Sequence, residues 1–220
     1  MTNTEILSHI DHTLLRATST AAEIDALCEE ALRLNTASVC IPPSYVSYVR
    51  DKFPGLNICT VIGFPLGYST TAVKCFEAQD AIQNGASEID MVIDLGMVKN
   101  GDFDGVEAEI AAVKTSCGDK LLKVIVETCY LTEEEKIQLC GCVTRAGADF
   151  IKTSTGFGTA GAKIEDIRLF SQHIGENVRM KAAGGVKSRE DLEMFLEAGC
   201  DRIGTSSAVK LLTGGAAAGY

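Results

Sequence analysis

The chain has 220 residues, of which 46% are hydrophobic and 23% are charged, and its formal net charge is −10 at pH 7. This length and composition predict a single globular domain spanning residues 1–220, with enough apolar side chains for a large core. The negative charge excludes a general nucleic-acid binder, so any anionic ligand must be held by a local feature.

The cysteines and the N-terminus indicate the compartment. The thiols are scattered through apolar runs without the paired spacing of a zinc site, at positions 28, 40, 59, 75, 117, 129, 140, 142 and 200. The first ten residues lack the basic and apolar regions of a secretory signal, and no run of 18 apolar residues occurs in the chain. These features predict reduced thiols in a cytoplasmic protein without a membrane partner.

From the N-terminus onward, short apolar strands alternate with amphipathic helices. A first strand is expected near residues 8–14, and the capping box Thr20-x-x-Glu23 then opens a helix with one apolar face. A second capping box, Thr132-x-x-Glu135, and a weaker one beginning at Ser188 open later helices, and another helix follows Asp102. Seven apolar or β-branched runs between the helices are predicted to be buried parallel strands: 38–42, 58–62, 88–94, 121–126, 149–152, 178–181 and 201–204.

An internal quasi-repeat indicates how these units are arranged. The segments NGASEID (84–90), AGADFIK (146–152) and AGCDRIG (198–204) each place a helix-ending glycine before a polar residue and a strand. Successive copies are about two βα units of roughly 30 residues apart, and the strand count reaches eight. We therefore predict a single (β/α)8 barrel with a short flexible C-terminal tail at about 213–220, and a doubly wound open sheet is the alternative.

In such a barrel, chemistry takes place at the carboxyl ends of the strands. The polar residues expected there are Asp11, His12, Cys40, Asp90, Asp94, Lys123, Glu127, Lys152 and Lys181. Lys152 and Lys181 occupy matching places in consecutive units, so their ammonium groups should lie close together in a low-dielectric interior, and this should lower at least one lysine pKa. Such a lysine is a nucleophile toward carbonyl carbons, and the alternative is a structural ion network with Asp90.

Glycine-rich turns follow the last three predicted strands, at 153–156, 183–187 and 204–207. They offer backbone N–H groups, hydroxyls and a helix N-terminus, which suit a phosphate dianion. Three such turns at one end of a barrel favour a phosphate site over ordinary chain reversals.

The sequence resembles the deoxyribose-phosphate aldolase family of class I aldolases along essentially its whole length. The resemblance rests on the segments DHTLL (11–15), VCIPP (39–43), GFPLG (63–67), EIDMVID (88–94), LKVIVET (122–128), FIKTSTGF (150–157), KAAGGV (181–186) and IGTSS (203–207). It implies reversible cleavage of 2-deoxy-D-ribose 5-phosphate to D-glyceraldehyde 3-phosphate and acetaldehyde, in the catabolism of deoxynucleosides. It also implies that no metal or organic cofactor is needed and that the chain forms a homodimer or a higher homo-oligomer.

The resemblance assigns roles to particular residues. Lys152 matches the Schiff-base lysine, Lys181 the second lysine that perturbs it, and Asp90 the aspartate that acts with a bound water as general acid and base. Asp11 and Lys123 match supporting positions in the barrel interior. Tyr220 matches a terminal tyrosine that can assist proton transfer. Phosphate binding is implied for Gly156, Gly184, Gly185, Ser206 and Ser207.

Two positions depart from the family pattern. Phe157 stands where many similar sequences carry a lysine, so phosphate binding should be weaker or should depend more on Lys187. Asp94 stands where asparagine is expected, and either alters the local protons or is simply solvated.

Other polar residues favour structural readings. His12 is expected to be a hydrogen-bonded structural histidine, with a catalytic role as the alternative. Cys40 lies near the site and could react with aldehydes, but it is expected to be inert packing. Because no set of His, Cys or carboxylate residues has metal-ligand spacing, a metal-dependent aldolase is disfavoured. The rival functions are a phosphosugar isomerase or another lysine-dependent lyase on the same barrel, and a non-catalytic sugar-phosphate binder.

Overall fold

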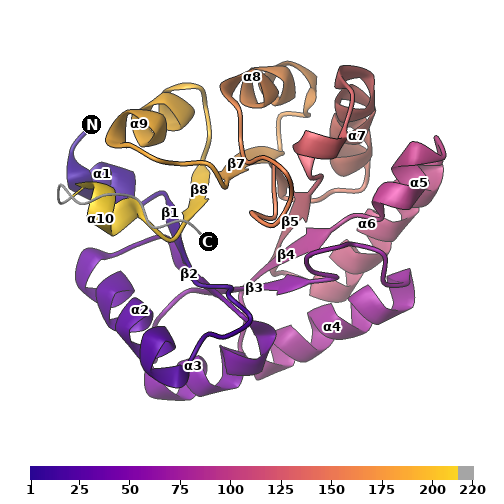
Figure 1. Cartoon of the computed structure of the whole chain (residues 1–220). Coiled ribbons are helices and arrows are strands. Elements are labelled where there is room, and N and C mark those ends of the chain that lie inside the picture. The colour runs from indigo at the N-terminus through magenta and orange to yellow at the C-terminus, as the bar shows by residue number, and fades with distance from the viewer. Residues whose placement is uncertain (213–220) are drawn as a thin grey trace.

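The computed structural model describes residues 1–212, and within them eight parallel strands close into a barrel in sequence order. Figure 1 shows the helices ringing these strands. The closed barrel confirms the predicted fold and excludes the doubly wound open sheet. The strands are β1 (Ile10–Thr13), β2 (Ser38–Ile41), β3 (Ile58–Ile62), β4 (Glu88–Val92), β5 (Leu121–Ile125), β6 (Phe150–Lys152), β7 (Arg179–Ala183) and β8 (Arg202–Thr205).

The helices begin where the sequence supplies capping groups. Thr20, Thr132 and Ser188 each form a reciprocal capping box, as predicted, and Asp102 caps a helix by accepting a hydrogen bond from Gly105 N–H. The α-helices are α1 (Asn3–Leu7), α2 (Ala21–Leu34), α3 (Val46–Lys52), α4 (Thr71–Asn84), α5 (Leu95–Lys99), α6 (Phe103–Cys117), α7 (Glu133–Arg145), α8 (Ile164–His173), α9 (Arg189–Glu197) and α10 (Ala208–Leu212). Two short 3-10 helices, η1 (Pro43–Tyr45) and η2 (Thr128–Tyr130), follow β2 and β5.

Alternation along the strands divides the buried side chains into two sets. Residues such as Val39, Ile89 and Ile203 point outward and join the large apolar cluster between strands and helices. A separate, smaller apolar cluster contains Leu15, Cys40, Cys59 and Val61, with Phe64 packed against it. The strand residues of this second set alternate with the outward-facing ones and lie inside the barrel.

The register of the strands fixes which inward residues meet. Asp90 pairs with Val61 on one side and Lys123 on the other, and Lys152 pairs directly with Lys181. Neighbouring strands are about 4.8 Å apart, so side chains from β4, β5, β6 and β7 converge at one level of the barrel. The predicted closeness of the two lysines is confirmed at the level of strand register.

The predicted tail at 213–220 lies outside the described residues, as does Tyr220. Among residues 1–212, no helix is long and apolar enough to cross a membrane.

Candidate active site

The interior of the barrel has two chemically different sides. Apolar side chains and thiols from β2 and β3 form one side, with Cys40, Cys59 and Val61 as its centre. Buried charged side chains from the other strands form the second side, which holds Asp11, Glu88, Asp90, Lys123, Lys152 and Lys181. A small molecule at the carboxyl ends of the strands would therefore contact ammonium and carboxylate groups on one side and apolar atoms on the other.

Asp90 is the hub of the charged side. Its Oδ2 accepts hydrogen bonds from Lys152 Nζ at 2.6 Å and from Lys181 Nζ at 2.8 Å. Its Oδ1 accepts from Lys123 Nζ at 3.0 Å and from the Cys59 thiol at 3.1 Å. One carboxylate thus holds three ammonium groups from three consecutive strands.

The three lysines differ in exposure and in partners. The Lys152 side chain is 4% exposed and donates to Asp90. The Lys181 and Lys123 side chains are 0% exposed; Lys181 also bonds Asp11, and Lys123 also bonds Glu88. Lys152 is therefore the most exposed of the three lysines.

A second layer of charges lies beneath the lysines. Asp11 Oδ2 is 2.5 Å from Lys181 Nζ, and Asp11 Oδ1 accepts hydrogen bonds from Ser38 Oγ at 2.8 Å and from Arg202 Nη1 at 2.6 Å. Arg202 also bonds both carboxylate oxygens of Glu88. Because each buried charge in this layer has an opposite partner, the layer can hold Lys181 and Lys123 in place.

These contacts shift the acid–base equilibria in known directions. Burial would raise the pKa of Asp90, but the ammonium groups of Lys123, Lys152 and Lys181 outweigh it and hold this pKa well below its usual range. Burial would lower the pKa of Lys181, but Asp11 and Asp90 outweigh it and raise this pKa. Lys123 behaves in the same way, with Asp90 as its strongest partner.

Of the paired lysines Lys152 and Lys181, at least one was expected to have a lowered pKa, and the pKa of Lys181 is instead raised. The expectation counted the crowded ammonium groups and only one carboxylate. The structure adds Asp11 and Glu88 to the same layer, and their attraction exceeds both the repulsion and the loss of hydration.

The glycine turns after β6 and β7 lie against each other. Gly156, Gly184 and Gly185 have φ values of +89°, +72° and +75°, which side-chain-bearing residues rarely adopt. A Cβ atom added to Gly184 would lie 3.2 Å from Gly161 Cα and 3.5 Å from Gly156 Cα. The backbones of Gly156, Gly161 and Gly184 therefore approach one another closely. Backbone N–H groups gathered in this way can bind an anion.

The remaining residues of the predicted phosphate site follow β7 and β8. Ser207 is buried and donates its backbone N–H to Thr205 Oγ1, while Ser206 is half-buried. Lys187 is exposed, and its backbone N–H donates to Asp191 at the start of α9. The structure thus brings the backbones of Gly156 and Gly184 together.

Glu127 has a positioning role that the sequence did not assign. It lies in the left-handed region with φ +54°, which is uncommon for a residue with a side chain. Its buried carboxylate accepts hydrogen bonds from Thr155 N–H at 3.2 and 3.3 Å and from the Thr155 hydroxyl. Burial raises its pKa. Glu127 thereby ties the end of β5 to the turn that follows Lys152.

The two departures from the family pattern have local explanations. Asp94 caps α5, because its Oδ1 accepts hydrogen bonds from Gly96 N–H at 2.7 Å and from Met97 N–H at 3.3 Å. Phe157 is exposed at the mouth, and its ring meets Phe64 edge to face with centroids 5.4 Å apart. An aromatic pair thus occupies the position where similar sequences carry a lysine.

His12 faces away from the barrel interior. Its Nε2 is 2.8 Å from Glu30 Oε2 on α2, so it joins the first strand to the second helix. Burial lowers its pKa, and Glu30 opposes that effect. This geometry supports the structural role that the sequence favours.

The register also assembles side chains that sequence spacing does not connect. Ligand atoms of Cys40, Cys59 and Asp90 lie within 4.8 Å of one another, and so do those of Asp11, Cys59 and Glu88. Three lysines already occupy the Asp90 carboxylate, and their positive charges repel a metal cation. Cys59, Glu88 and Arg202 are members of the site that sequence reasoning missed.

Comparisons with known proteins agree on one family. The model of the DeoC/LacD family aldolases matches residues 6–219. A deoxyribose-phosphate aldolase of Clostridium botulinum (strain Alaska E43 / Type E3) is 58% identical over 221 residues, covering all of both chains. One from Streptococcus pyogenes serotype M12 is 59% identical over 209 residues, covering 94% of each chain. Among solved structures, the tetrameric deoxyribose phosphate aldolase of Aeropyrum pernix is 33% identical with a TM-score of 0.87, covering 96% of this chain and 91% of that one.

Proposed function

The chain belongs to the DeoC/LacD family of aldolases, and from this premise we propose that it is a class I aldolase that cleaves 2-deoxy-D-ribose 5-phosphate reversibly to D-glyceraldehyde 3-phosphate and acetaldehyde. The observation that carries the proposal is the hydrogen bond between Lys152 Nζ and Asp90 Oδ2 inside the barrel, beside two further ammonium groups. A nucleophilic amine next to a proton acceptor is what Schiff-base chemistry requires.

Lys152 is the nucleophile in this proposal. Its side chain is the most exposed of the three lysines, and in the part of the chain that the structure describes it bonds one carboxylate rather than two. The amine passes a proton to Asp90 and attacks C1 of the open-chain sugar. Loss of water from the resulting carbinolamine leaves an iminium ion, which is an electron sink.

The carbon–carbon bond then breaks between C2 and C3. A base removes the proton of the C3 hydroxyl, C3 becomes the aldehyde of glyceraldehyde 3-phosphate, and the bonding electrons flow into the iminium to give an enamine. Asp90, with a bound water, supplies and accepts these protons. Protonation of the enamine at C2 and hydrolysis release acetaldehyde and regenerate Lys152. Because the iminium accepts the electrons, these steps need neither a metal nor an organic cofactor.

Lys181, Lys123 and Asp11 act electrostatically. Lys181 donates to the same oxygen of Asp90 as Lys152 does. Its positive charge therefore stabilises the carboxylate form, to which Asp90 returns each time it gives up a proton. Asp11 holds Lys181 from the opposite side, and Lys123 binds the second oxygen of Asp90. The two-carbon fragment contacts the apolar side formed by Cys40, Cys59 and Val61.

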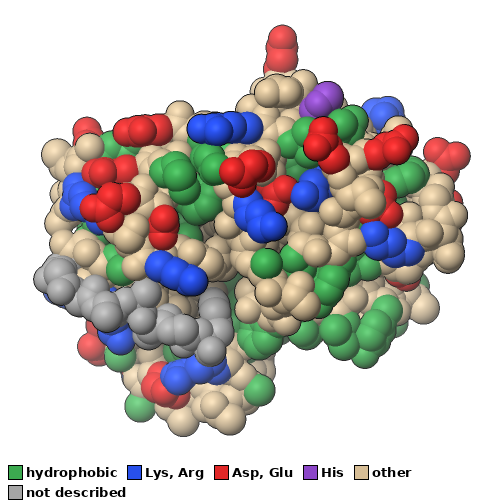
Figure 2. All heavy atoms as spheres, turned by 45° about the horizontal axis from the view of Figure 1, so that its top comes forward, with side chains coloured by type: hydrophobic (Ala, Val, Ile, Leu, Met, Phe, Trp, Pro, Cys, Tyr) green, Lys and Arg blue, Asp and Glu red, His purple; other side chains and the backbone are tan. Residues whose placement is uncertain are grey.

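The phosphate binds at the glycine turns. The backbones of Gly156, Gly184 and Gly185 supply N–H donors, and Ser206 and Ser207 precede α10 at the next strand end. Lys187 contributes a positive charge from the exposed rim. The face drawn in Figure 2 has acidic and basic side chains interspersed, so the phosphate is held locally rather than by a basic surface. A terminal role for Tyr220 stays part of the proposal and lies outside the described residues.

Two broader features belong to the same proposal. The chain assembles as a homodimer or higher homo-oligomer, which the tetrameric relative and the exposed apolar side chains Leu66, Tyr68, Val73 and Phe76 support. It works in a reducing cytoplasm, which the unpaired state of all nine cysteines supports.

The test is a product assay that separates the rival functions. The chain is mixed with 2-deoxy-D-ribose 5-phosphate, and acetaldehyde is followed through alcohol dehydrogenase and NADH. Equal amounts of acetaldehyde and glyceraldehyde 3-phosphate are expected. Formation of an isomeric sugar phosphate would identify an isomerase, and binding without any product would identify a non-catalytic binder.

A further inference from the structure

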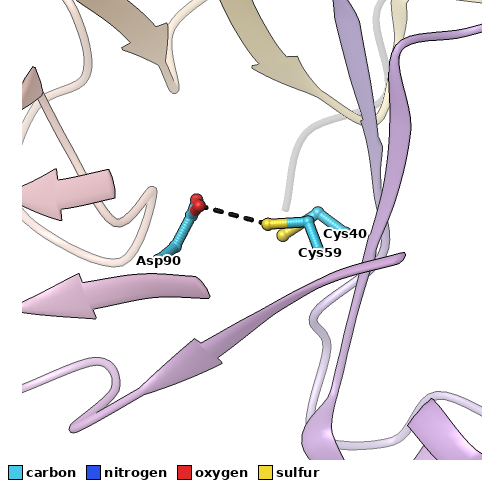
Figure 3. A group of neighbouring side chains, drawn as sticks. All are labelled: Cys40, Cys59 and Asp90. Carbon is cyan, nitrogen blue, oxygen red and sulfur yellow. Dashed lines mark hydrogen bonds between the residues drawn. The ribbon is translucent and has the colours of Figure 1, made fainter. Parts of the chain in front are cut away.

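Two thiols face each other inside the barrel and take no part in the bond-making and proton transfers of the proposed reaction. Cys40 on β2 and Cys59 on β3 are register partners on neighbouring parallel strands. Figure 3 shows their sulfur atoms side by side, both directed toward Asp90. The two Sγ atoms and a carboxylate oxygen of Asp90 all lie within 4.8 Å of one another.

The backbone spacing suits a covalent bond between these sulfurs. Register partners on neighbouring strands have Cα atoms about 4.8 Å apart. Disulfides close when the Cα atoms are roughly 4.4–6.8 Å apart and the side chains point the same way. Because Cys40 and Cys59 both point into the barrel, a disulfide can form without moving either strand far.

Cys40 is also the more reactive member of the pair. The neighbouring Cys59 thiol lowers the pKa of Cys40 and outweighs burial, which raises it. Burial and Cys40 raise the pKa of Cys59 well above its usual range. By contrast, burial raises the pKa of Cys28, Cys117, Cys140 and Cys200 to about 12. Since the thiolate is the species that reacts with peroxides, oxidation should begin at Cys40.

We propose that Cys40 and Cys59 form an oxidation site, at which a hydroperoxide closes a disulfide between β2 and β3 and switches the enzyme off until a dithiol reduces it. In the first step, the Cys40 thiolate attacks one peroxide oxygen. The O–O bond breaks, an S–O bond forms, and the other oxygen takes up the proton that the Cys40 thiol released and leaves as water or an alcohol. In the second step, the Cys59 sulfur attacks the Cys40 sulfenic acid, the S–S bond forms, and water leaves with the Cys59 proton. The peroxide gains the two electrons that the thiols lose.

The disulfide would disturb the charged side of the barrel through Cys59. The Cys59 thiol donates to Asp90 Oδ1 at 3.1 Å and accepts from Lys123 Nζ at 3.3 Å. Once Cys59 is in a disulfide it has no S–H to donate, so Asp90 loses one of its four hydrogen bonds described above. The disulfide would also lie on the apolar side of the barrel, next to Asp90, the carboxylate that bonds Lys152. The loss of activity rests on the proposed function, whereas formation of the disulfide does not.

The first test detects the bond itself. The full chain is treated with hydrogen peroxide, quenched with catalase, alkylated and digested with trypsin without reduction. Tryptic peptides 34–50 and 53–74 contain Cys40 and Cys59, respectively, as their only cysteines, so a linked pair identifies this disulfide. The proposal expects the linked pair as the main oxidation product. Failure to find it, with other cysteines oxidised instead, would overturn the proposal whether or not the enzyme has aldolase activity.

The second test separates the disulfide from other damage. Acetaldehyde release should fall at least tenfold as the linked peptide accumulates and should return when dithiothreitol is added. Cys59→Ser should leave a Cys40 sulfenic acid that dimedone traps, and no linked peptide. The matched control is Cys75→Ser, which removes a thiol on α4 outside the barrel interior and should keep both the peroxide sensitivity and the linked peptide. Peroxide inactivation of Cys59→Ser that dithiothreitol fully reverses would contradict the disulfide as the cause.

Discussion

The Asp90 carboxylate makes hydrogen bonds with most of the buried charged groups in the candidate active site. Its two oxygens accept hydrogen bonds from three lysines and one thiol, all buried inside the barrel. Burial is the largest single influence on the pKa of Asp90 and would raise it, but the ammonium groups around the carboxylate together outweigh burial and lower this pKa. Removing one of those charges should change the acidity of Asp90 as well as the rate.

Lys181→Met tests this dependence. Methionine keeps much of the lysine's length but lacks its charge, so the pKa of Asp90 should rise toward its ordinary value. We expect kcat to fall about 100-fold or more, within the range for loss of acid–base assistance, and the acidic limb of the pH profile of kcat/KM to move to higher pH.

The control for this substitution is Lys99→Met on α5, where an exposed lysine pairs with Glu135. Its activity and pH profile should match the parent chain. Circular dichroism should establish that Lys181→Met is folded. A folded variant with reduced activity but an unmoved pH profile would mean that Lys181 acts only as packing.

At the scale of elements, the turns after β6 and β7 join the reactive lysine to the phosphate site. A Cβ added to Gly184 would make a tight contact of 3.2 Å with Gly161 Cα and an ordinary contact with Gly156 Cα. Glu127 holds the same region in place, because its carboxylate accepts hydrogen bonds from the Thr155 N–H and hydroxyl groups. The geometry of these turns should therefore determine the binding of the phosphate more than the rate of bond cleavage.

Gly184→Ala tests whether these turns affect phosphate binding more than the rate of bond cleavage. The substitution strains a residue with φ +72° and places a Cβ 3.2 Å from Gly161 Cα, so it should raise KM for 2-deoxyribose 5-phosphate about tenfold and change kcat less. It should also lower the free energy of unfolding by roughly 1 kcal/mol.

Gly147→Ala is a matched control, because Gly147 also has φ +72° but nothing lies within 4 Å of an added Cβ. It precedes β6, at the end of the barrel opposite to the turns. A similar loss of stability with an unchanged KM is expected. If both variants raised KM equally, a general loosening of the barrel would explain the effect and the turn would have no specific role.

The sequence predicted these elements well where local signals are strong. The capping boxes at Thr20, Thr132 and Ser188 fixed three helix starts, and the repeated helix-ending glycines predicted the barrel. The short α1 and α5 carried too few residues for a periodic pattern. The left-handed conformation of Glu127 has no sequence signal comparable to a glycine, so its hydrogen bonds with Thr155 are apparent only in the folded structure.

At the scale of the molecule, closing the barrel is what turns separate strands into a site. The sequence places charged residues at the carboxyl ends of the predicted strands, and the family resemblance implies roles for five of them: Asp11, Asp90, Lys123, Lys152 and Lys181. Glu88 and Arg202 sit one layer deeper, at the beginnings of their strands, where a charged residue normally marks a solvated strand end. Their proximity depends on the register around the barrel, which also brings Asp11 and Asp90 to Lys181. Burial alone would lower the pKa of this lysine, and the two carboxylates raise it.

The buried charges should make the stability of the whole barrel depend on pH. The folded-state pKa values of Asp11 and Asp90 lie below the unfolded value of about 4, so their stabilisation is present above that value and is lost as the pH falls toward the folded values. Lys123 and Lys181 have raised pKa values, so their contribution is present below about pH 10.4 and is lost as the pH rises through the folded values.

Urea denaturation across pH checks this expectation. The free energy of unfolding should be nearly level from about pH 6 to 9 and should fall by at least about 1 kcal/mol between pH 5 and pH 3. Asp11→Asn should have a shallower acidic slope, because it removes one of the two carboxylates. An acidic limb with the same slope in both proteins would assign the acid sensitivity to other groups.

The measurement that bears most directly on the account is reductive trapping of the covalent intermediate. The chain is incubated with acetaldehyde and sodium borohydride, digested with trypsin and analysed by mass spectrometry, with Lys152→Arg as the control. Because an ethylated lysine resists trypsin, we predict a modified peptide spanning residues 146–163 in the parent chain and none in the variant. A chain that forms no adduct, or that is modified only on surface lysines, would contradict the assignment of Lys152 as the Schiff-base nucleophile.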